Sequence, residues 1–420
     1  MEINNTREFS SFMKSGIYRL NSDPTTTITF IDPVLVLNNS YNRFRVSPSN
    51  YYSRFLIKQQ QQTPIPRKRK RKNKPPRALN QREQSADQRH QEGRPLLLKA
   101  HQSLLGSTDI LSWIRNLKSD LSNANAMDLS SRVGNGVHKS LIELGNAWQA
   151  PLYDISLYLC RIQEGGSERK VVEMFNNMVI NDTSDDAEAR FLHNRYIIPK
   201  ESCFHMSKME QIHRLIPVTL FPAMPNEGFN VIVIDPPWEN GSARQKSMYP
   251  TLANRHLLSI PIKQLTHTDG ALVALWVTNR EKLRMFIEKE LFPMWGVSYT
   301  TLLYWLKVKP DGSLIGELDL FHHRPYECLL LGYSHREGVN CEPLQTFKDL
   351  RRNQVIISVP GDYSRKPPIG KLLSDYAPGL KPARCIELFA RELLAGWTSW
   401  GNEPLHFQES KYFLRKSTNE

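Results

Sequence analysis

The sequence predicts a doubly wound α/β domain that follows a helical N-terminal region. Three observations support this prediction. Apolar residues recur at helical spacing before residue 197, short β-branched runs alternate with amphipathic segments after it, and residues 231–234 form an uninterrupted apolar run that ends at an acidic turn. A strand that is apolar on both faces is typical of the centre of a parallel sheet covered by helices.

The α/β domain is expected to span residues 197–420. Strands are expected at 231–234, 271–277, 298–306, 328–331, 355–359 and 385–389. Helices are expected at 281–290 and 367–376. This alternation favours a sheet with helices on both faces, in which ligands bind beyond the carboxyl ends of the strands.

The first 94 residues divide into two parts by composition. Residues 1–57 contain strand-like runs at 27–31 and 34–37 and predict a small folded element. Residues 58–94 are rich in Gln, Pro and basic residues, and such a composition predicts a disordered linker because it buries too little apolar surface. Eight of the eleven residues at 67–77 are Lys or Arg and none is acidic, which predicts a nuclear import signal read by an import receptor. The alternative is a merely solvated run of charge.

Residues 95–196 are expected to form a helical scaffold. Two groups of apolar residues show helical spacing there: Leu104, Ile110, Leu111, Ile114 and Leu117, and then Val171, Val172, Met174, Phe175 and Met178.

Composition bounds the class of protein. The 55 Lys and Arg residues exceed the 42 Asp and Glu residues, and a formal charge of +13 favours a polyanionic partner such as nucleic acid. Five scattered cysteines without metal-ligand spacing argue against a zinc site and a disulfide framework. No apolar stretch reaches about 18 residues, so we expect neither a membrane span nor a secretion signal.

The apolar run 231–234 ends at Asp235-Pro236-Pro237-Trp238. The prolines lack N–H groups and fix φ, so the turn is stiff and its carbonyls remain free to accept hydrogen bonds. The Asp235 carboxylate and the Pro236 carbonyl suit the two N–H groups of an aromatic amine such as that of adenine, and Trp238 offers a flat surface for stacking. The alternative is a rigid structural turn with Asp235 as a cap and Trp238 in the core.

A second segment points to the same edge of the sheet. The strand expected at 385–389 ends in an acidic and basic cluster that contains Glu387 and Arg391, and residues 396–403 are expected to form a polar turn. Two polar strand ends of this kind predict a binding site between them.

With both segments, the chain resembles the N6-adenine methyltransferases with the Asp-Pro-Pro-Trp signature (MT-A70-like), and most closely their methyltransferase-like protein four branch. The resemblance covers residues 199–413. It implies a Rossmann-like S-adenosylmethionine-dependent methyltransferase fold in circularly permuted order, in which the catalytic strand precedes the cofactor-binding strand. Asp235 does precede Glu387.

The resemblance also implies site residues. The catalytic group would be Asp235, Pro236, Pro237 and Trp238, with no metal. The residues implied for S-adenosyl-L-methionine are Ser207, Met209, Asp235, Lys366, Glu387, Leu388, Arg391, Asn402 and Glu403. Among them, Glu387 and Arg391 match an ion pair beside the cofactor, and Asn402 and Glu403 match contacts to its ribose. The alternative for Lys366 is a solvent-exposed lysine at a helix start. For Glu387 and Arg391 it is a surface salt bridge, and for Asn402 and Glu403 it is a turn.

The resemblance implies Tyr249 and Glu327 as residues of the target-base pocket. Asn279 follows another strand that is expected to end at the same edge of the sheet, and Lys307 and Arg365 are basic residues near the expected active face. Lys307 and Arg365 would contact phosphates, or would be ordinary solvated charges. Asn279 would contact the substrate, or would cap the following helix.

The function expected from the resemblance is N6-methylation of adenosine in RNA, in particular of 2′-O-methyladenosine in small nuclear RNA, by a monomeric nuclear enzyme. RNA is favoured because its single-stranded loops present splayed bases. The alternatives are an N6-adenine DNA methyltransferase and an inactive nucleic-acid-binding scaffold.

Overall fold

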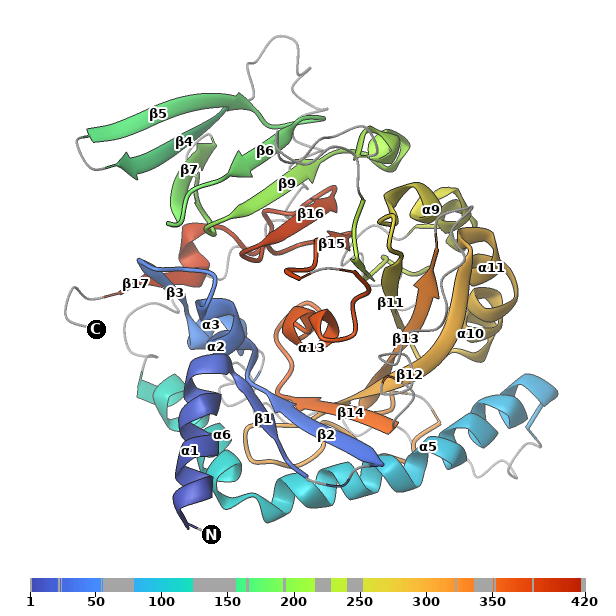
Figure 1. The fold of residues 1–420 in the computed structure, drawn as a ribbon. Coiled ribbons are helices and arrows are strands. Elements are labelled where there is room, and N and C mark those ends of the chain that lie inside the picture. The colour runs from blue at the N-terminus through green and yellow to red at the C-terminus, as the bar shows by residue number, and fades with distance from the viewer. Residues whose placement is uncertain are drawn as a thin grey trace, which may run out of the picture.

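A computed structural model gives the fold (Figure 1). It describes residues 2–53, 79–123, 156–215, 228–239, 252–335 and 353–416, together with Phe55 and Leu350, apart from positions 22, 24, 164, 165, 192, 193, 322 and 380. The largest element in this part of the chain is an eleven-stranded sheet with the order β1-β2-β14-β12-β13-β11-β10-β15-β16-β9-β6. Within the described ranges, no helix has the length and apolarity that crossing a membrane requires.

The centre of the sheet is mostly parallel. Strand β10 (Val231–Ile234) pairs in parallel with β11 (Ala271–Val277) on one side and with β15 (Cys385–Leu388) on the other, and β15 pairs in parallel with β16 (Trp397–Gly401). Strand β16 then pairs in parallel with β9 (Ser202–Met206). The carboxyl ends of these five strands therefore lie at one edge of the sheet.

The other half of the sheet contains one reversed strand. Strand β13 (Tyr326–Ser334) runs antiparallel between β11 and β12 (Val297–Lys307), so that its first residues lie at the edge where its neighbours end. Beyond β12, strands β14 (Asn353–Ser358) and β2 (Thr26–Ile31) continue in parallel. The short strands β1 (Ile17–Arg19) and β6 (Met178–Asn181) pair antiparallel at the two outer edges.

The sheet is covered on both faces. Val231 and Val233 belong to the apolar cluster of one face, which includes Ile369 and Leu373 of the α13 segment, and Figure 1 shows α13 (Gly370–Ser374) on the inner side of the curved sheet. Ile232 belongs to the cluster of the opposite face. That face is covered by short helical elements: η2 (Met209–Leu215), η3 (Asn254–Ser259), α9 (Ile262–Leu265), α10 (Glu281–Phe286), η4 (Ile287–Leu291) and α11 (Phe292–Trp295).

The N-terminal segment is part of this body. It consists of α1 (Glu2–Ser15), the edge strands β1 and β2, α2 (Pro33–Asn38), β3 (Phe44–Val46) and α3 (Pro48–Tyr51). With α5 (Gln81–Gly106) and α6 (Thr108–Asn123), it forms a third apolar cluster against β14 and β12. Strand β3 pairs with β17 (Phe413–Arg415), which follows η5 (Ser410–Tyr412), so the N-terminal segment contacts the C-terminal part of the chain there.

A four-stranded antiparallel sheet stands beside the main one (Figure 1). Its strands are β4 (Ser156–Gln163), β5 (Gly166–Glu173), β7 (Ala187–Phe191) and β8 (Asn194–Ile198), in the order β5-β4-β7-β8. The expectation of a helical scaffold across 95–196 therefore agrees with α5 and α6 and is wrong for the described residues of 156–196. The predicted helical group Val171 to Met178 lies in β5, β6 and the segment between them.

Three other expectations need correction. Residues 34–37 lie in α2, because the Asp32 carboxylate accepts hydrogen bonds from the N–H groups of Val34 and Leu35 and Pro33 occupies the first turn. The linker is shorter than 58–94, because α5 begins at Gln81 behind a capping box formed by Asn80 and Glu83. The predicted turn at 396–403 contains strand β16. The basic run 67–77 lies outside the described residues.

The strands expected after residue 197 are confirmed. The bounds of 231–234 and 271–277 match β10 and β11 at both ends, and the other four expected strands overlap β12, β13, β14 and β15. The helix expected at 281–290 is confirmed as α10 and η4, and that expected at 367–376 is confirmed as the shorter α13.

Candidate active site

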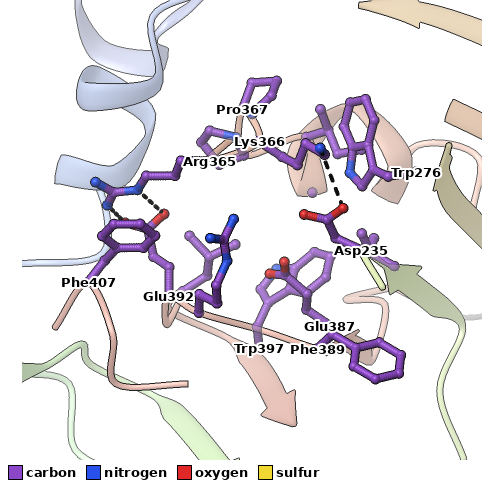
Figure 2. A pocket seen from close by; sticks show the side chains of 16 residues that line it. Asp235, Trp276, Arg365, Lys366, Pro367, Glu387, Phe389, Glu392, Trp397 and Phe407 are labelled. Atoms are coloured by element: carbon purple, nitrogen blue, oxygen red, sulfur yellow. Dashed lines mark hydrogen bonds and ion pairs between the residues drawn. The ribbon is translucent and has the colours of Figure 1, made fainter. Parts of the chain in front are cut away.

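A pocket lies where the parallel strands end. Asp235 follows β10, Glu387 lies in β15, and Trp276 lies near the end of β11; all three line this pocket together with the segment 365–370 (Figure 2). The N–H group of Asp235 donates to the carbonyl of Leu388 at 3.3 Å, which fixes the turn against the neighbouring strand. The predicted meeting of Asp235 and Glu387 at one edge is thus present.

Lys366 connects two carboxylates of the pocket region. Its Nζ lies 3.5 Å from Oδ1 of Asp235 and donates to Oε2 of Glu327 at 2.8 Å. Burial raises the pKa of Asp235, and the nearby Lys366 and Arg391 only partly offset this rise. Burial would lower the pKa of Lys366, yet the two carboxylates raise it above its ordinary value, so Lys366 stays protonated.

Among the carboxylates of this site, Glu327 is the one whose negative charge is most fully balanced by neighbouring lysines. It comes from the start of β13 and pairs with both Lys366 and Lys307, which lies at the end of β12. Although burial acts to raise its pKa, the two ammonium groups lower it to about 2. Glu327 and Lys307 therefore belong to an ion-pair network in which the charge of Glu327 is balanced without a ligand. The Nζ of Lys307 also lies 4.3 Å from the centroid of the Trp305 ring.

Glu387 is in the opposite situation. Within the described ranges its carboxylate has no hydrogen bond or ion pair, and burial together with the charge of Asp235 raises its pKa to about 8. A buried carboxylate without a counter-ion is unfavourable unless a ligand supplies one. S-adenosylmethionine carries a sulfonium and an ammonium group, so the charge of this pocket fits that cofactor.

The segments that carry these groups have strained backbone. Tyr363 and Ser364, just before Lys366, have φ of 53° and 58°, and Phe389, just after β15, has φ of 63°. Left-handed backbone at residues other than glycine costs on the order of 1–3 kcal/mol each and is concentrated at functional sites. Both strained segments border the pocket.

The signature turn departs from expectation at Trp238. Its indole is only 8 % exposed, packs in the apolar cluster opposite α13, and donates from Nε1 to the carbonyl of Trp276 at 2.8 Å. The structure therefore gives Trp238 a packing role, and the exposed stacking surface predicted for it is wrong. The Pro236 carbonyl accepts from the N–H group of Trp238 at 2.8 Å, which leaves one of its two lone pairs, and the Pro237 carbonyl accepts from Leu252.

Two of the predicted substrate residues are occupied elsewhere. Arg365 is 4 % exposed and forms a two-pronged ion pair with Glu392, so it is not the phosphate contact that the sequence suggested. Asn279 donates from Nδ2 to the carbonyl of Tyr326 and joins β11 to β13, and the next helix has no side-chain cap. Tyr249 lies outside the described residues.

The remaining predicted cofactor residues surround the same edge. Arg391 lines the pocket but is not ion-paired with Glu387; its Nη1 donates to the Tyr363 carbonyl at 2.8 Å. Leu388 is fully buried in the core, so only its backbone faces the site. Ser207, after β9, accepts from Nε1 of Trp400 at 2.9 Å and donates its N–H to Gly401.

Two further predicted positions follow β16, and one lies in η2. Glu403 pairs with Nδ1 of His406 at 2.9 Å, and Asn402 precedes it directly after the strand. Met209 begins η2 and packs against the apolar cluster of that face. Among the described residues, none of these three lines the pocket that holds Asp235 and Glu387.

Sequence reasoning missed three contributors to the pocket. Trp276 and Phe407 line it, and Glu392 neutralises Arg365. Trp276 could have been found, because it lies near the end of an apolar strand at the expected edge. Phe407 and Glu392 carry no local signal, since their roles depend on contacts across the fold.

Comparison with known proteins agrees with this geometry. The model of the MT-A70 family matches residues 229–403, which contain Asp235, Lys366 and Glu387. N(6)-adenine-specific methyltransferase METTL4 of Mus musculus is 34 % identical over 259 residues, covering 60 % of this chain and 53 % of that protein.

Two further relatives differ in the nucleic acid that they are named for. N6-methyladenosine RNA methyltransferase MTA1 of Pyricularia oryzae is 37 % identical over 54 % of this chain and 58 % of its own length. DNA N6-methyl methyltransferase of Caenorhabditis elegans is 31 % identical over 53 % of this chain and 56 % of its own length. The chain spans a little over half the length of these relatives.

Proposed function

We propose that this chain, whose residues 229–403 match the model of the MT-A70 family, is a member of that family and an S-adenosylmethionine-dependent methyltransferase that modifies the N6 amino group of adenine in RNA or DNA. The observation that carries the proposal is the pocket in which Asp235 and Glu387, at the ends of adjacent parallel strands, meet Lys366. The names of the relatives support the same reaction.

Asp235 would bind and orient the acceptor. Adenine's amino nitrogen is a poor nucleophile because its lone pair is conjugated with the ring. The Asp235 carboxylate can accept one N–H hydrogen bond and the remaining lone pair of Pro236 the other, which holds the nitrogen for an in-line approach. Orientation of this kind contributes roughly 7 to 11 kcal/mol to lowering a barrier. The nitrogen gains a methyl group and loses one proton to water.

Glu387 would hold the cofactor. When bound, S-adenosylmethionine supplies a methyl group on a positively charged sulfur. The Glu387 carboxylate can balance such a cation, and Lys366 favours the ionised form of Asp235, which is the form that accepts hydrogen bonds. The chain order supports a circularly permuted Rossmann-like arrangement, because β10 with its acceptor turn precedes β15.

RNA is the favoured substrate, in particular adenosine that is already 2′-O-methylated in small nuclear RNA. The resemblance to the methyltransferase-like protein four branch supports this choice. DNA adenine is the second candidate, because one relative is named as a DNA methyltransferase. The third candidate, an inactive scaffold, would bind nucleic acid without modifying it.

Label transfer tests these alternatives. The purified chain is incubated with methyl-labelled S-adenosylmethionine and matched RNA and DNA oligonucleotides, with and without 2′-O-methylation of the target adenosine. We expect label in N6-methyladenine, highest with the 2′-O-methylated RNA, and none with Asp235→Ala. Equal transfer by Asp235→Ala would reject the catalytic assignment, and binding without transfer by the natural chain would support the scaffold.

We also propose that the chain acts as a monomer in the nucleus. The basic run at 67–77 supports nuclear entry, since clustered Lys and Arg flanked by prolines suit an import receptor. A chain lacking residues 67–74 should lose its nuclear accumulation in cells. Nuclear accumulation of that shortened chain would contradict the proposal.

A further inference from the structure

We propose that Tyr51, from the N-terminal segment, is a positioning residue for Lys366 and acts on it through Arg365. This inference rests on the proposed function, since it assigns Lys366 a place in the methyl-transfer site. Residues 48–53 then help to position a side chain of that site, although they lie about 180 residues before Asp235 in the chain.

The segment that carries Lys366 needs support from outside itself. It runs from the end of β14 to α13 and contains the two residues with left-handed backbone, Tyr363 and Ser364. Strain of on the order of 1–3 kcal/mol at each such residue persists only where the surroundings impose the conformation. The source of that constraint therefore decides where Lys366 lies.

Residues at the end of α3 and just after it hold this segment through polar contacts. The N–H group of Asp362 donates to the Tyr51 carbonyl at 3.2 Å, and the Ser53 hydroxyl donates to the Asp362 carboxylate. A Cβ atom at Gly361 would lie 2.7 Å from the Tyr51 ring, so this ring packs directly against the Gly361 backbone. These contacts fix the start of the strained turn.

The Tyr51 ring holds the next part of the segment through Arg365. The guanidinium carbon lies 4.3 Å from the centroid of the Tyr51 ring and 4.2 Å from that of the Phe407 ring. Its charge is balanced by Glu392. Contact with two aromatic rings together with an ion pair fixes the position of a guanidinium group.

Arg365 and Lys366 point in opposite directions. Figure 2 shows Arg365 directed towards Phe407 and Glu392, and Lys366 directed towards Trp276 and Asp235. Because the two residues are adjacent in the chain, anchoring one side chain sets the backbone from which the other extends. A shift of Arg365 would change the 3.5 Å separation between Lys366 and Asp235.

The ring of Tyr51, and not its hydroxyl, performs this role. The residue is 1 % exposed, and its hydroxyl oxygen has no hydrogen-bond partner among the described residues. Tyr51→Phe is therefore a matched control that keeps the stacking surface. Tyr51→Leu removes the stacking surface, and Ser53→Ala removes only the hydroxyl that donates to Asp362 without altering the core.

The first measurement is methyl transfer by the full chain. Misplacing a reacting group costs about 10- to 100-fold in rate, so we expect Tyr51→Leu to lower kcat by that factor while KM for the oligonucleotide stays nearly constant. Ser53→Ala should show a smaller loss of kcat, and Tyr51→Phe should match the natural chain. Equal losses in Tyr51→Phe and Tyr51→Leu would overturn the proposal.

The pH profile separates positioning from simple loss of stability. Asp235 is faced by Lys366 and Arg391, which lower its pKa, and by Glu327 and Glu387. If Lys366 moves away, the pKa of Asp235 rises, and the acid limb of the kcat profile of Tyr51→Leu moves to higher pH. A lower kcat with an unmoved acid limb would indicate a structural role alone and would overturn the proposal.

Trypsin supplies a readout that needs no activity. Arg365 is buried, and Pro367 blocks cleavage after Lys366, so a cut between Arg365 and Lys366 reports release of Arg365. We expect faster cleavage into fragments 1–365 and 366–420 in Tyr51→Leu than in Tyr51→Phe. Equal cleavage rates would overturn the positioning role. Failure of the natural chain to methylate would reject the proposed function and leave this comparison to decide the positioning role.

Discussion

Glu327 and Glu387 lie on two sides of Lys366 and Asp235, and their surroundings differ sharply. Glu327 has two ammonium partners and a pKa of about 2, whereas Glu387 has none among the described residues and a pKa of about 8. Both are partly buried carboxylates that sequence reasoning assigned to the site. The comparison indicates that the Glu327 side is complete without a ligand, whereas the Glu387 side gains stability when a cation binds.

Lys366 connects the two sides, so its loss should have the largest effect. Lys366→Met removes one partner of Glu327 and the only ammonium group that the structure places within ion-pair distance of Asp235 in the described ranges. We expect the methyl-transfer rate to fall about 100- to 1,000-fold, as for loss of a preorganised charge in an active site. Steady-state kinetics measure this. Lys371→Met, at an exposed position of α13, is the control and should keep its activity, and similar rates for both variants would contradict the role of Lys366.

The pH dependence of protein stability should show the effect of the Glu387 carboxylate, which has no ion-pair partner among the described residues. The unfolded chain loses the Glu387 proton near pH 4.5, but the folded chain keeps it until about pH 8, so this group makes the free energy of unfolding fall as pH rises between these values. Glu387→Gln should be more stable than the natural chain at pH 8, by on the order of 2 kcal/mol, and nearly equal to it at pH 4.5. Urea unfolding at both pH values measures the difference. The exposed control Glu290→Gln should show no such pH dependence.

Cofactor affinity should show the converse effect. Removing the Glu387 charge leaves a bound cation without its partner, so Glu387→Gln should weaken S-adenosylmethionine binding about 10-fold. Isothermal titration calorimetry at pH 8 gives the two dissociation constants. The neutral product S-adenosylhomocysteine should lose less affinity, and equal losses for both ligands would argue against a charge interaction at Glu387.

The smallest effect is expected on the salt dependence of nucleic-acid binding when Arg365 is replaced. Its charge is balanced by Glu392 and its guanidinium contacts the rings of Tyr51 and Phe407, so we expect no contact with phosphate. Arg365→Met combined with Glu392→Gln should leave the slope of log affinity against log salt unchanged for a single-stranded oligonucleotide. Loss of one phosphate contact would reduce that slope by about 0.7, and fluorescence anisotropy would detect this change.

The sequence predicted the centre of the fold well. Val231–Ile234 and Ala271–Val277 are fully apolar because both faces of β10 and β11 are covered, and such runs have few alternatives. The polar residues that follow them, Asp235 and Asn279, could therefore be assigned to one edge of the sheet. The resemblance supplied Lys366 and Glu327, which lie far from Asp235 in the chain but beside it in the fold.

The errors have a common cause in contacts that are distant in sequence. Trp238 looked like an exposed aromatic because nothing nearby shows that its indole donates to β11. Arg365 looked like a phosphate contact because its partners, Tyr51, Glu392 and Phe407, are spread over the whole chain. Apolar spacing at 171–178 fitted a helix, and only pairing with β4 and β9 makes it strand.

The central claim is that the Asp235 carboxylate holds adenine for methylation. The most direct test is the single-turnover rate of N6-methyladenine formation by Asp235→Asn, which removes the charge but keeps the shape. Asp375→Asn makes the same chemical change at an exposed position of the α13 segment. The account predicts a loss of at least about 100-fold for Asp235→Asn and none for Asp375→Asn. Equal rates for the two variants would contradict it.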